Sequence, residues 1–377
     1  MRVDAGVVVE VGGAPQPGDE VLHANGWLLL PAMAEAHAHL DKAFLAETVP
    51  NPRGDLMGAI EAMETYRDRI TLEDTIVRAE RAARLIARNG ATAIRTHADL
   101  TTQNGLMSVQ ALVEVRDRLR DIIHIEVIAL CGWPIVGPVG ADQRALLRDA
   151  IDVGVDGVGG CPHLESDPHG ANDLFLTMAA EAGLPVDLHT DETLDPSRFA
   201  LPDLVKRVMK TGFSHGVTAS HCVSLGMQPD FVQQAVSELI AQAGISVVAL
   251  PSSNMYLQGR DQQVGMPRAL TAVRALRRAG ANLAAGADNL QDPFNLVGRG
   301  DCLETASLMV MAGHLLPEHA YHSVSGAVRA AMRLPTAGTE VGDTADLVLI
   351  NAGSVREAVA FGPGDRIVIR AGQIIRG

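Results

Sequence analysis

A repeated pairing of a short apolar run with a longer helical pattern is the feature that most constrains the fold of this 377-residue chain. Glycine follows several of the helical patterns, and the next apolar run begins within a few residues. Glycine accepts the left-handed conformation that closes a helix C-terminus, so each of these glycines marks the passage from a helix to a strand. The glycines in question are Gly90, Gly154, Gly183, Gly244 and Gly280.

The apolar runs predict eight strands. We expect them at residues 27–36, 92–96, 125–130, 157–159, 185–188, 217–220, 246–250 and 282–285. Runs such as Val-Val-Ala-Leu are apolar throughout, which suits parallel strands buried on both faces. Eight strand–helix units over roughly 260 residues match an α/β fold of the (β/α)8 TIM-barrel type. An open, doubly wound sheet is the alternative.

The two ends of the chain differ from its middle. Residues 1–30 are rich in β-branched residues and glycine, and residues 340–377 resemble about three short strands. A helical stretch at about 301–333 would lead from the barrel to this second segment. We expect residues 1–30 and 336–377 to combine into one small β-domain beside a barrel of residues 31–335.

Composition excludes several classes of function. The net charge is −14, which disfavours binding to nucleic acid or to an anionic membrane. No basic segment precedes an apolar one at the N-terminus, and no apolar run reaches the roughly 18 residues of a membrane span. The four cysteines form no CxxC pair, so neither a disulfide framework nor a thiolate zinc site is indicated. These observations predict a cytoplasmic protein.

Two histidines close the first predicted strand. His37 and His39 are two residues apart, so in a strand they project to the same side. The carboxyl ends of barrel strands meet at the mouth where such barrels place their chemistry, and two imidazoles are half of a metal site. Two structural histidines at a strand end are the alternative interpretation.

Other predicted strand ends carry similar groups. The fifth strand is followed by His189 and Glu192, the sixth by His221, and the eighth by Asp288 and Asn289. Three histidine sites and a carboxylate at four strand ends predict a metal site at the barrel mouth.

This ordered set resembles the amidohydrolase superfamily, and within it the cytosine deaminase-like group. Further segments carry the resemblance, which spans nearly the whole chain. They are Thr96-His97-Ala98-Asp99, Pro162-His163-Leu164-Glu165, His189-Thr190-Asp191-Glu192 and Asn254–Arg260.

The resemblance implies one divalent ion, Zn²⁺ or Fe²⁺, held by His37, His39, His189 and Asp288. Members with two ions bridge them with a carboxylated lysine after the fourth strand, and residues 157–163 contain no lysine. Asp288 would accept a proton from the attacking water, His221 would orient that water, and Glu192 would carry a proton to the ring and then to the leaving amine. Relatives are often multimeric, so the resemblance also implies a possible homo-oligomer.

Two departures from cytosine deaminases concern the substrate. Gly132 falls where those enzymes carry a glutamine that binds the pyrimidine edge, and Asn289 replaces an aspartate. Such changes alter the pattern of donors and acceptors that a ring meets, so we do not expect specificity for cytosine. Candidate substrate contacts are Trp133, Gln258, Arg260 and Asn289.

The sequence thus predicts a metal-dependent aminohydrolase that releases ammonia from a small, amino-substituted nitrogen heterocycle. One alternative is hydrolysis of a cyclic amide or of an N-alkylamino group on a heterocycle. Another is a catalytically silent barrel that binds metal and serves as a ligand-binding protein.

Overall fold

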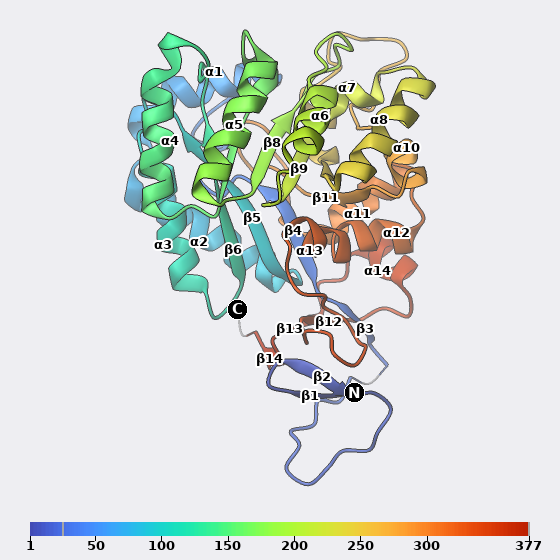
Figure 1. Cartoon of the computed structure of the whole chain (residues 1–377). Helices are drawn as coiled ribbons and strands as arrows, with labels where there is room; N and C mark the ends of the chain where they lie inside the picture. Colours follow the sequence, from blue (N-terminus) through green and yellow to red (C-terminus); the bar gives the residue numbers. More distant parts are fainter. Residues whose placement is uncertain (25, 376–377) are drawn as a thin grey trace.

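Eight parallel strands form one sheet within residues 1–24 and 26–375, the part of the chain that the computed structural model describes (Figure 1). Each strand is hydrogen-bonded to its neighbour in chain order, and all eight overlap the predicted runs, so the predicted barrel is confirmed. The strands are β4 (Met33–Ala38), β5 (Ala91–Leu100), β6 (His124–Cys131), β7 (Gly157–Gly160), β8 (Val186–Thr190), β9 (Val217–His221), β10 (Ser246–Ala249) and β11 (Asn282–Ala285).

The first and last strands of this sheet meet at their carboxyl ends. Ala38 and Asp288 form a parallel bridge. The Asp288 amide donates to the carbonyl of His37 at 2.9 Å, and the His39 amide donates to the carbonyl of Asp288 at 3.2 Å. The barrel therefore closes at the predicted metal-binding segments.

Helices surround the strands, and left-handed glycines end several of them as predicted: Gly154, Gly183 and Gly244 have φ of 101°, 69° and 64°. The helices are α1 (Leu56–Tyr66), α2 (Leu72–Arg88), α3 (Met107–Leu119), α4 (Ala141–Val153), α5 (Pro168–Ala182), α6 (Leu201–Thr211), α7 (Val223–Gly226), α8 (Asp230–Ala243), α9 (Pro251–Leu257), α10 (Val273–Arg278), α11 (Cys302–Met311), α12 (Pro317–Ser323), α13 (Gly326–Ala331) and α14 (Val355–Phe361). Short 3₁₀ turns are η1 (Arg67–Arg69), η2 (Pro138–Gly140) and η3 (Pro162–Leu164).

The expectation of a single first strand at residues 27–36 is wrong. The chain forms β3 (Leu28–Pro31), which pairs with a C-terminal strand, and then enters the barrel as β4. Proline has no amide hydrogen and is typical of strand ends, so Pro31 marks the change of sheet. The barrel strand consequently extends to Ala38 and contains His37.

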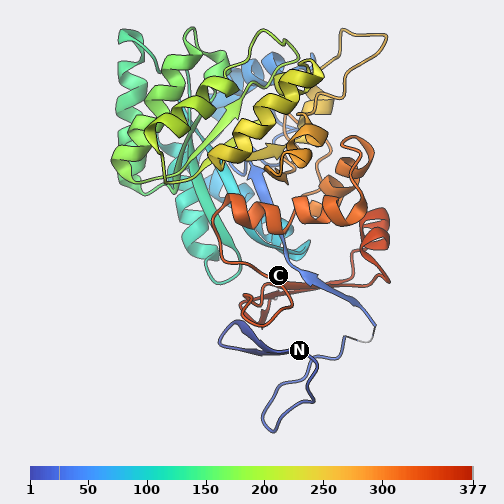
Figure 2. The ribbon, with the colours of Figure 1, turned by 45° about the vertical axis from the view of Figure 1, so that its right-hand side comes forward.

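Both chain ends contribute to two small sheets. β1 (Arg2–Asp4) pairs with β2 (Val7–Glu10), and β3 joins β12 (Leu347–Ile350), β13 (Arg366–Arg370) and β14 (Gln373–Ile374). Figures 1 and 2 show these sheets below the barrel, with α1 at its opposite end.

The helix α14 interrupts the C-terminal strands and was not expected. Ser354 accepts a hydrogen bond from the amide of Glu357 at 3.1 Å, and the Glu357 carboxylate accepts one from the amide of Gly353 at 2.9 Å. Ser-x-x-Glu is a helix-start signal, so the sequence contained the information.

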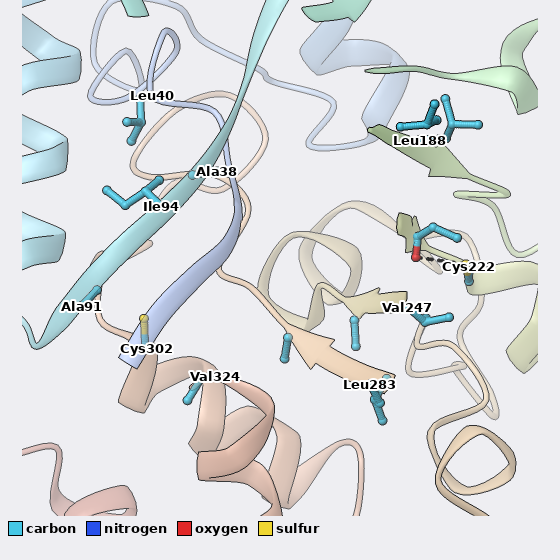
Figure 3. Packing of buried hydrophobic residues seen from close by; sticks show 14 of the residues in the cluster. Ala38, Leu40, Ala91, Ile94, Leu188, Cys222, Val247, Leu283, Cys302 and Val324 are labelled. Carbon is cyan, nitrogen blue, oxygen red and sulfur yellow. Dashed lines mark hydrogen bonds between the residues drawn. The ribbon is translucent and has the colours of Figure 1, made fainter. Parts of the chain in front are cut away.

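An apolar layer between strands and helices forms the main core. Figure 3 shows part of this cluster, including Ile94 of β5, Leu188 of β8 and Val247 of β10. Among the described residues, none of the helices combines the length and the apolar character that a membrane crossing requires.

Candidate active site

Four side-chain atoms converge at the carboxyl ends of the strands. His37 Nε2 lies 3.2 Å from His189 Nε2, which lies 3.3 Å from His39 Nε2. Asp288 Oδ1 lies 3.7 Å from His37 Nε2 and 3.2 Å from His39 Nε2. All four side chains are buried. The structure thus brings together the four residues that the sequence predicted as ligands.

The distances between these four atoms can be compared with those expected around a tetrahedral metal ion. Tetrahedral ligands about 2.1 Å from Zn²⁺ lie about 3.4 Å from one another. The measured separations of 3.2–3.7 Å bracket that value. Three imidazole nitrogens and one carboxylate oxygen also form a donor set suited to zinc or iron. The residues present therefore fit a single divalent cation.

A hydrogen-bond relay sets the proton position on His37. Ser220 Oγ donates to Asp187 Oδ1 at 2.7 Å, so the same hydroxyl accepts from His37 Nδ1 at 3.0 Å. Arg95 in turn donates to Asp187 Oδ2 at 3.0 Å. With its proton on Nδ1, His37 presents an unprotonated Nε2 toward the cluster, as a metal ligand must.

Burial keeps two of the histidines neutral. The pKa of His37 and that of His189 are held well below the usual value, first by burial and then by the surrounding histidines. Neutral imidazole is the form that binds a metal ion.

His39 has a different environment. Its Nδ1 accepts a hydrogen bond from the Lys42 ammonium at 3.1 Å, which places the proton of a neutral ring on Nε2, facing Asp288. Lys42 also donates to Asp99 Oδ1 at 2.6 Å. Binding of a cation by His39 Nε2 must therefore displace a proton, as is usual for histidine sites.

Asp288 and His221 are held in unusual backbone conformations. Their φ angles are 68° and 67°, in the left-handed region that non-glycine residues seldom adopt. Such strain is concentrated at functional sites. Burial opposes ionisation of Asp288, but the hydrogen bond from His39 and the nearby His221 outweigh it, so its pKa lies below the usual value. The Asp288 carboxylate also accepts a hydrogen bond from Ser253.

A buried acid lies beside this cluster. Glu192 Oε1 is 3.5 Å from His221 Nδ1, and that nitrogen donates to Asn254 Oδ1 at 2.9 Å. Because the proton of a neutral His221 ring is then on Nδ1, its Nε2 is unprotonated. This Nε2 has no hydrogen-bond partner among the described residues. Burial, and then the charge of Asp288, raise the pKa of Glu192 well above its usual value. Its buried position therefore favours the protonated form of the carboxyl group.

A cavity of about 110 Å³ opens above the cluster. Two of the predicted substrate contacts line it, the half-exposed Trp133 and the buried Asn289, whose amide donates to Asp292 at 2.8 Å. Gly132 also lines the cavity, where a side chain would approach Thr101.

The other two predicted substrate contacts are not among the described residues that line this cavity. Gln258 follows α9, next to the lining residue Leu257. The Arg260 guanidinium stacks over the Tyr256 ring at 4.5 Å and lies against Gly54.

One wall of the cavity was not predicted from the sequence. Helix α1 and the following turn contribute Leu56, Ile60, Met63, Glu64 and Arg67. No motif marks these positions. Their amphipathic helical pattern was the available signal, and it does not reveal which surface the helix covers.

Two further histidines surround the cluster. His97 stacks on His37 with ring centroids 3.9 Å apart, and His163 Nδ1 donates to the carbonyl of His189 at 3.0 Å. Both are buried, and they contact the proposed ligands, as expected of supporting residues.

Comparison with known proteins places these features in a family. The amidohydrolase family model matches residues 54–376. A pterin deaminase of Rhizobium rhizogenes is 33% identical over 357 residues, which cover 92% of this chain and 80% of the relative.

Two solved structures are similar over nearly the whole chain. The 5-methylcytosine deaminase of Klebsiella pneumoniae has a TM-score of 0.90 and 28% identity, covering 100% of this chain and 93% of its own. The N-isopropylammelide isopropylaminohydrolase of Burkholderia multivorans has a TM-score of 0.84 and 27% identity, covering 99% and 93%. The resemblance predicted from the sequence is confirmed: this chain belongs to the amidohydrolase family.

Proposed function

We propose that this protein is a metal-dependent aminohydrolase that exchanges an amino group on a nitrogen heterocycle for oxygen and releases ammonia. The observation that carries the proposal is the position of Glu192. This acid lines the same cavity as His39, His189 and Asp288, and burial raises its pKa well above the usual value. The similar deaminases support the same reaction class.

His37, His39, His189 and Asp288 would hold one divalent ion, Zn²⁺ or Fe²⁺. When bound, the ion supplies Lewis acidity that makes a water molecule acidic enough to react at neutral pH. The ionised Asp288 carboxylate accepts the proton of that water. The free Nε2 of His221 accepts a hydrogen bond from it and orients it toward the ring.

Glu192 handles the protons of the substrate. Its carboxyl donates to the ring nitrogen next to the reacting carbon, which makes that carbon electrophilic as the new C–O bond forms. The proton held by Asp288 restores the acid, which then protonates the amino group. As the C–N bond breaks and ammonia leaves, the new hydroxyl group on the ring gives its proton to Asp288, which returns it to Glu192. The ring keeps the oxygen as a carbonyl, and both carboxyl groups regain their starting protonation.

Within this class we infer that the substrate is a flat bicyclic ring, such as a pterin. Gly132 lines the cavity and places no side chain where the cytosine deaminase-like group carries a glutamine. Trp133 offers a face on which an aromatic ring stacks. The relative named as a pterin deaminase supports this choice.

A second candidate is removal of an alkylamine from a ring. The similar isopropylaminohydrolase favours it, and Leu56, Ile60 and Met63 form an apolar wall that suits an alkyl group. The chemistry differs only in the leaving group.

One experiment separates these possibilities. The full chain, loaded separately with Zn²⁺ and Fe²⁺, is incubated with pterin, cytosine and N-isopropylammelide, and both ammonia and isopropylamine are measured. Ammonia from pterin, with little from cytosine, is the expected result. Isopropylamine release would favour the second candidate. Bound metal without turnover of any ring would support the silent barrel.

Three further features stay predictions. They are the division of the chain at residues 30 and 336, assembly into a homo-oligomer and a cytoplasmic location.

A further inference from the structure

The barrel closes where β4 meets the end of β11, and we call this junction the seam. Two of the proposed metal ligands lie on opposite sides of the seam. His37 belongs to β4, whereas Asp288 lies three residues beyond the end of β11. The distance between these ligands therefore depends on how the two strand ends are held together.

Strand β4 is irregular at this place. Glu35 pairs with Ile94 and Ala38 with Thr96, so β4 contains one residue more than β5 over this stretch. Such a bulge leaves an amide without a partner in the ladder and changes the direction of a side chain. The amide of His37 instead donates to Glu35 Oε1 at 3.1 Å.

The same oxygen also reaches across the seam. Glu35 Oε1 accepts a second hydrogen bond, at 2.9 Å, from the amide of Ala287, the residue before Asp288. The glutamate is 1% exposed. A side chain on Gly286 would come within 2.6 Å of this oxygen, so glycine is needed there to admit the carboxyl group.

We propose that Glu35 is a positioning residue that clamps β4 to the β11 end and sets the separation of His37 and Asp288, and thereby the affinity for the divalent ion. It accepts one amide from each side of the seam and touches neither the ion nor the substrate. Its action is that of an outer residue that orients metal ligands. The inference depends on the four-residue metal site proposed above.

Three variants of the full chain distinguish the position of the acceptor oxygen from the carboxyl group itself. Glu35→Gln keeps an oxygen that can accept both amides, Glu35→Asp keeps the carboxyl group but shortens the reach, and Glu35→Ala removes both. The affinity for Zn²⁺ alone is measured by competition with a chromogenic chelator. We expect Glu35→Asp and Glu35→Ala to lose about 10- to 100-fold in affinity, and Glu35→Gln to stay near the wild type.

Glu165 provides a matched control. It is also a buried glutamate that accepts an amide from another segment, Ile135 at 2.6 Å, but it lies away from the seam. Glu165→Ala should lower the melting temperature while the Zn²⁺ affinity stays unchanged.

Two outcomes overturn the clamp. One is wild-type Zn²⁺ affinity in Glu35→Asp, and the other is a 10- to 100-fold loss in Glu35→Gln, which would make the carboxyl group rather than its acceptor oxygen the cause. This comparison remains decisive if Glu35→Ala does not fold. If the wild-type chain itself binds no Zn²⁺, the metal site fails instead, so the two failures are distinguishable.

Discussion

The floor and the mouth of the cavity are built from different kinds of structure. The floor consists of three proposed ligands, His39, His189 and Asp288, with Glu192 and His221. These residues come from strand ends and are at most 7% exposed. The mouth consists of the α1 wall and of Trp133, which is 40% exposed. A sheet holds side chains in place through its ladder, whereas a helix and loops can vary independently. We therefore expect the floor to determine the reaction and the mouth to determine the substrate.

The largest effect is expected from the floor itself. Asp288→Ala removes one of four ligands and the group that accepts the proton from water, so both bound metal and turnover should fall below detection. Elemental analysis and an ammonia assay measure the two. Asp261→Ala, on the exposed surface, serves as the control and should preserve both. Full metal content in Asp288→Ala would contradict the ligand set.

A smaller loss of activity is expected from a variant that keeps the metal ion but lacks the Glu192 acid. Glu192→Gln keeps the shape of the side chain but cannot deliver a proton, so kcat should fall by about 10²- to 10⁴-fold with metal content unchanged. Turnover at the wild-type rate would show that another group delivers the proton.

Disruption of the hydrogen-bond relay from His37 through Ser220 to Asp187 should lower Zn²⁺ affinity moderately. Ser220→Ala removes the hydroxyl between His37 and Asp187, so the ring is no longer oriented, and Zn²⁺ affinity should fall about 10- to 100-fold. Ser237 is also buried, on α8, and its hydroxyl has no partner among the described residues. Ser237→Ala should therefore leave the affinity unchanged, and an equal loss in both variants would refute the relay.

The smallest effect is expected at the mouth. Trp133→Leu removes a stacking surface worth about 0.5–1.5 kcal/mol, so KM for a bicyclic ring should rise about 2- to 12-fold while kcat is unchanged. Trp27, the other tryptophan, lies just before β3 of the small C-terminal sheet and is not among the described residues that line the cavity. Trp27→Leu should therefore leave KM as it is. A fall in kcat alone would place Trp133 in the floor rather than the mouth.

The division between floor and mouth also separates the site residues whose positions could be predicted from the sequence from those whose positions could not. The convergence of the four proposed ligands was predictable because each lies at the end of an apolar run that local sequence marks as a strand. Parallel strands in a barrel bring their carboxyl ends together. Gln258 and Arg260 were chosen by resemblance alone. Their segment leaves the barrel as a loop, in which the Arg260 side chain lies against Tyr256 and Gly54, so these two substrate contacts stay predictions.

By itself, the sequence determined the barrel, its order of strands and the positions of His37, His39, His189 and Asp288, because periodicity and chain direction are local properties. Only the tertiary structure decided that α1 forms a wall of the cavity and that Glu35 bridges the seam. Both depend on contacts between segments that are distant along the chain, and no local pattern specifies them: the carboxyl of Glu35 meets the amide of Ala287 across 252 positions.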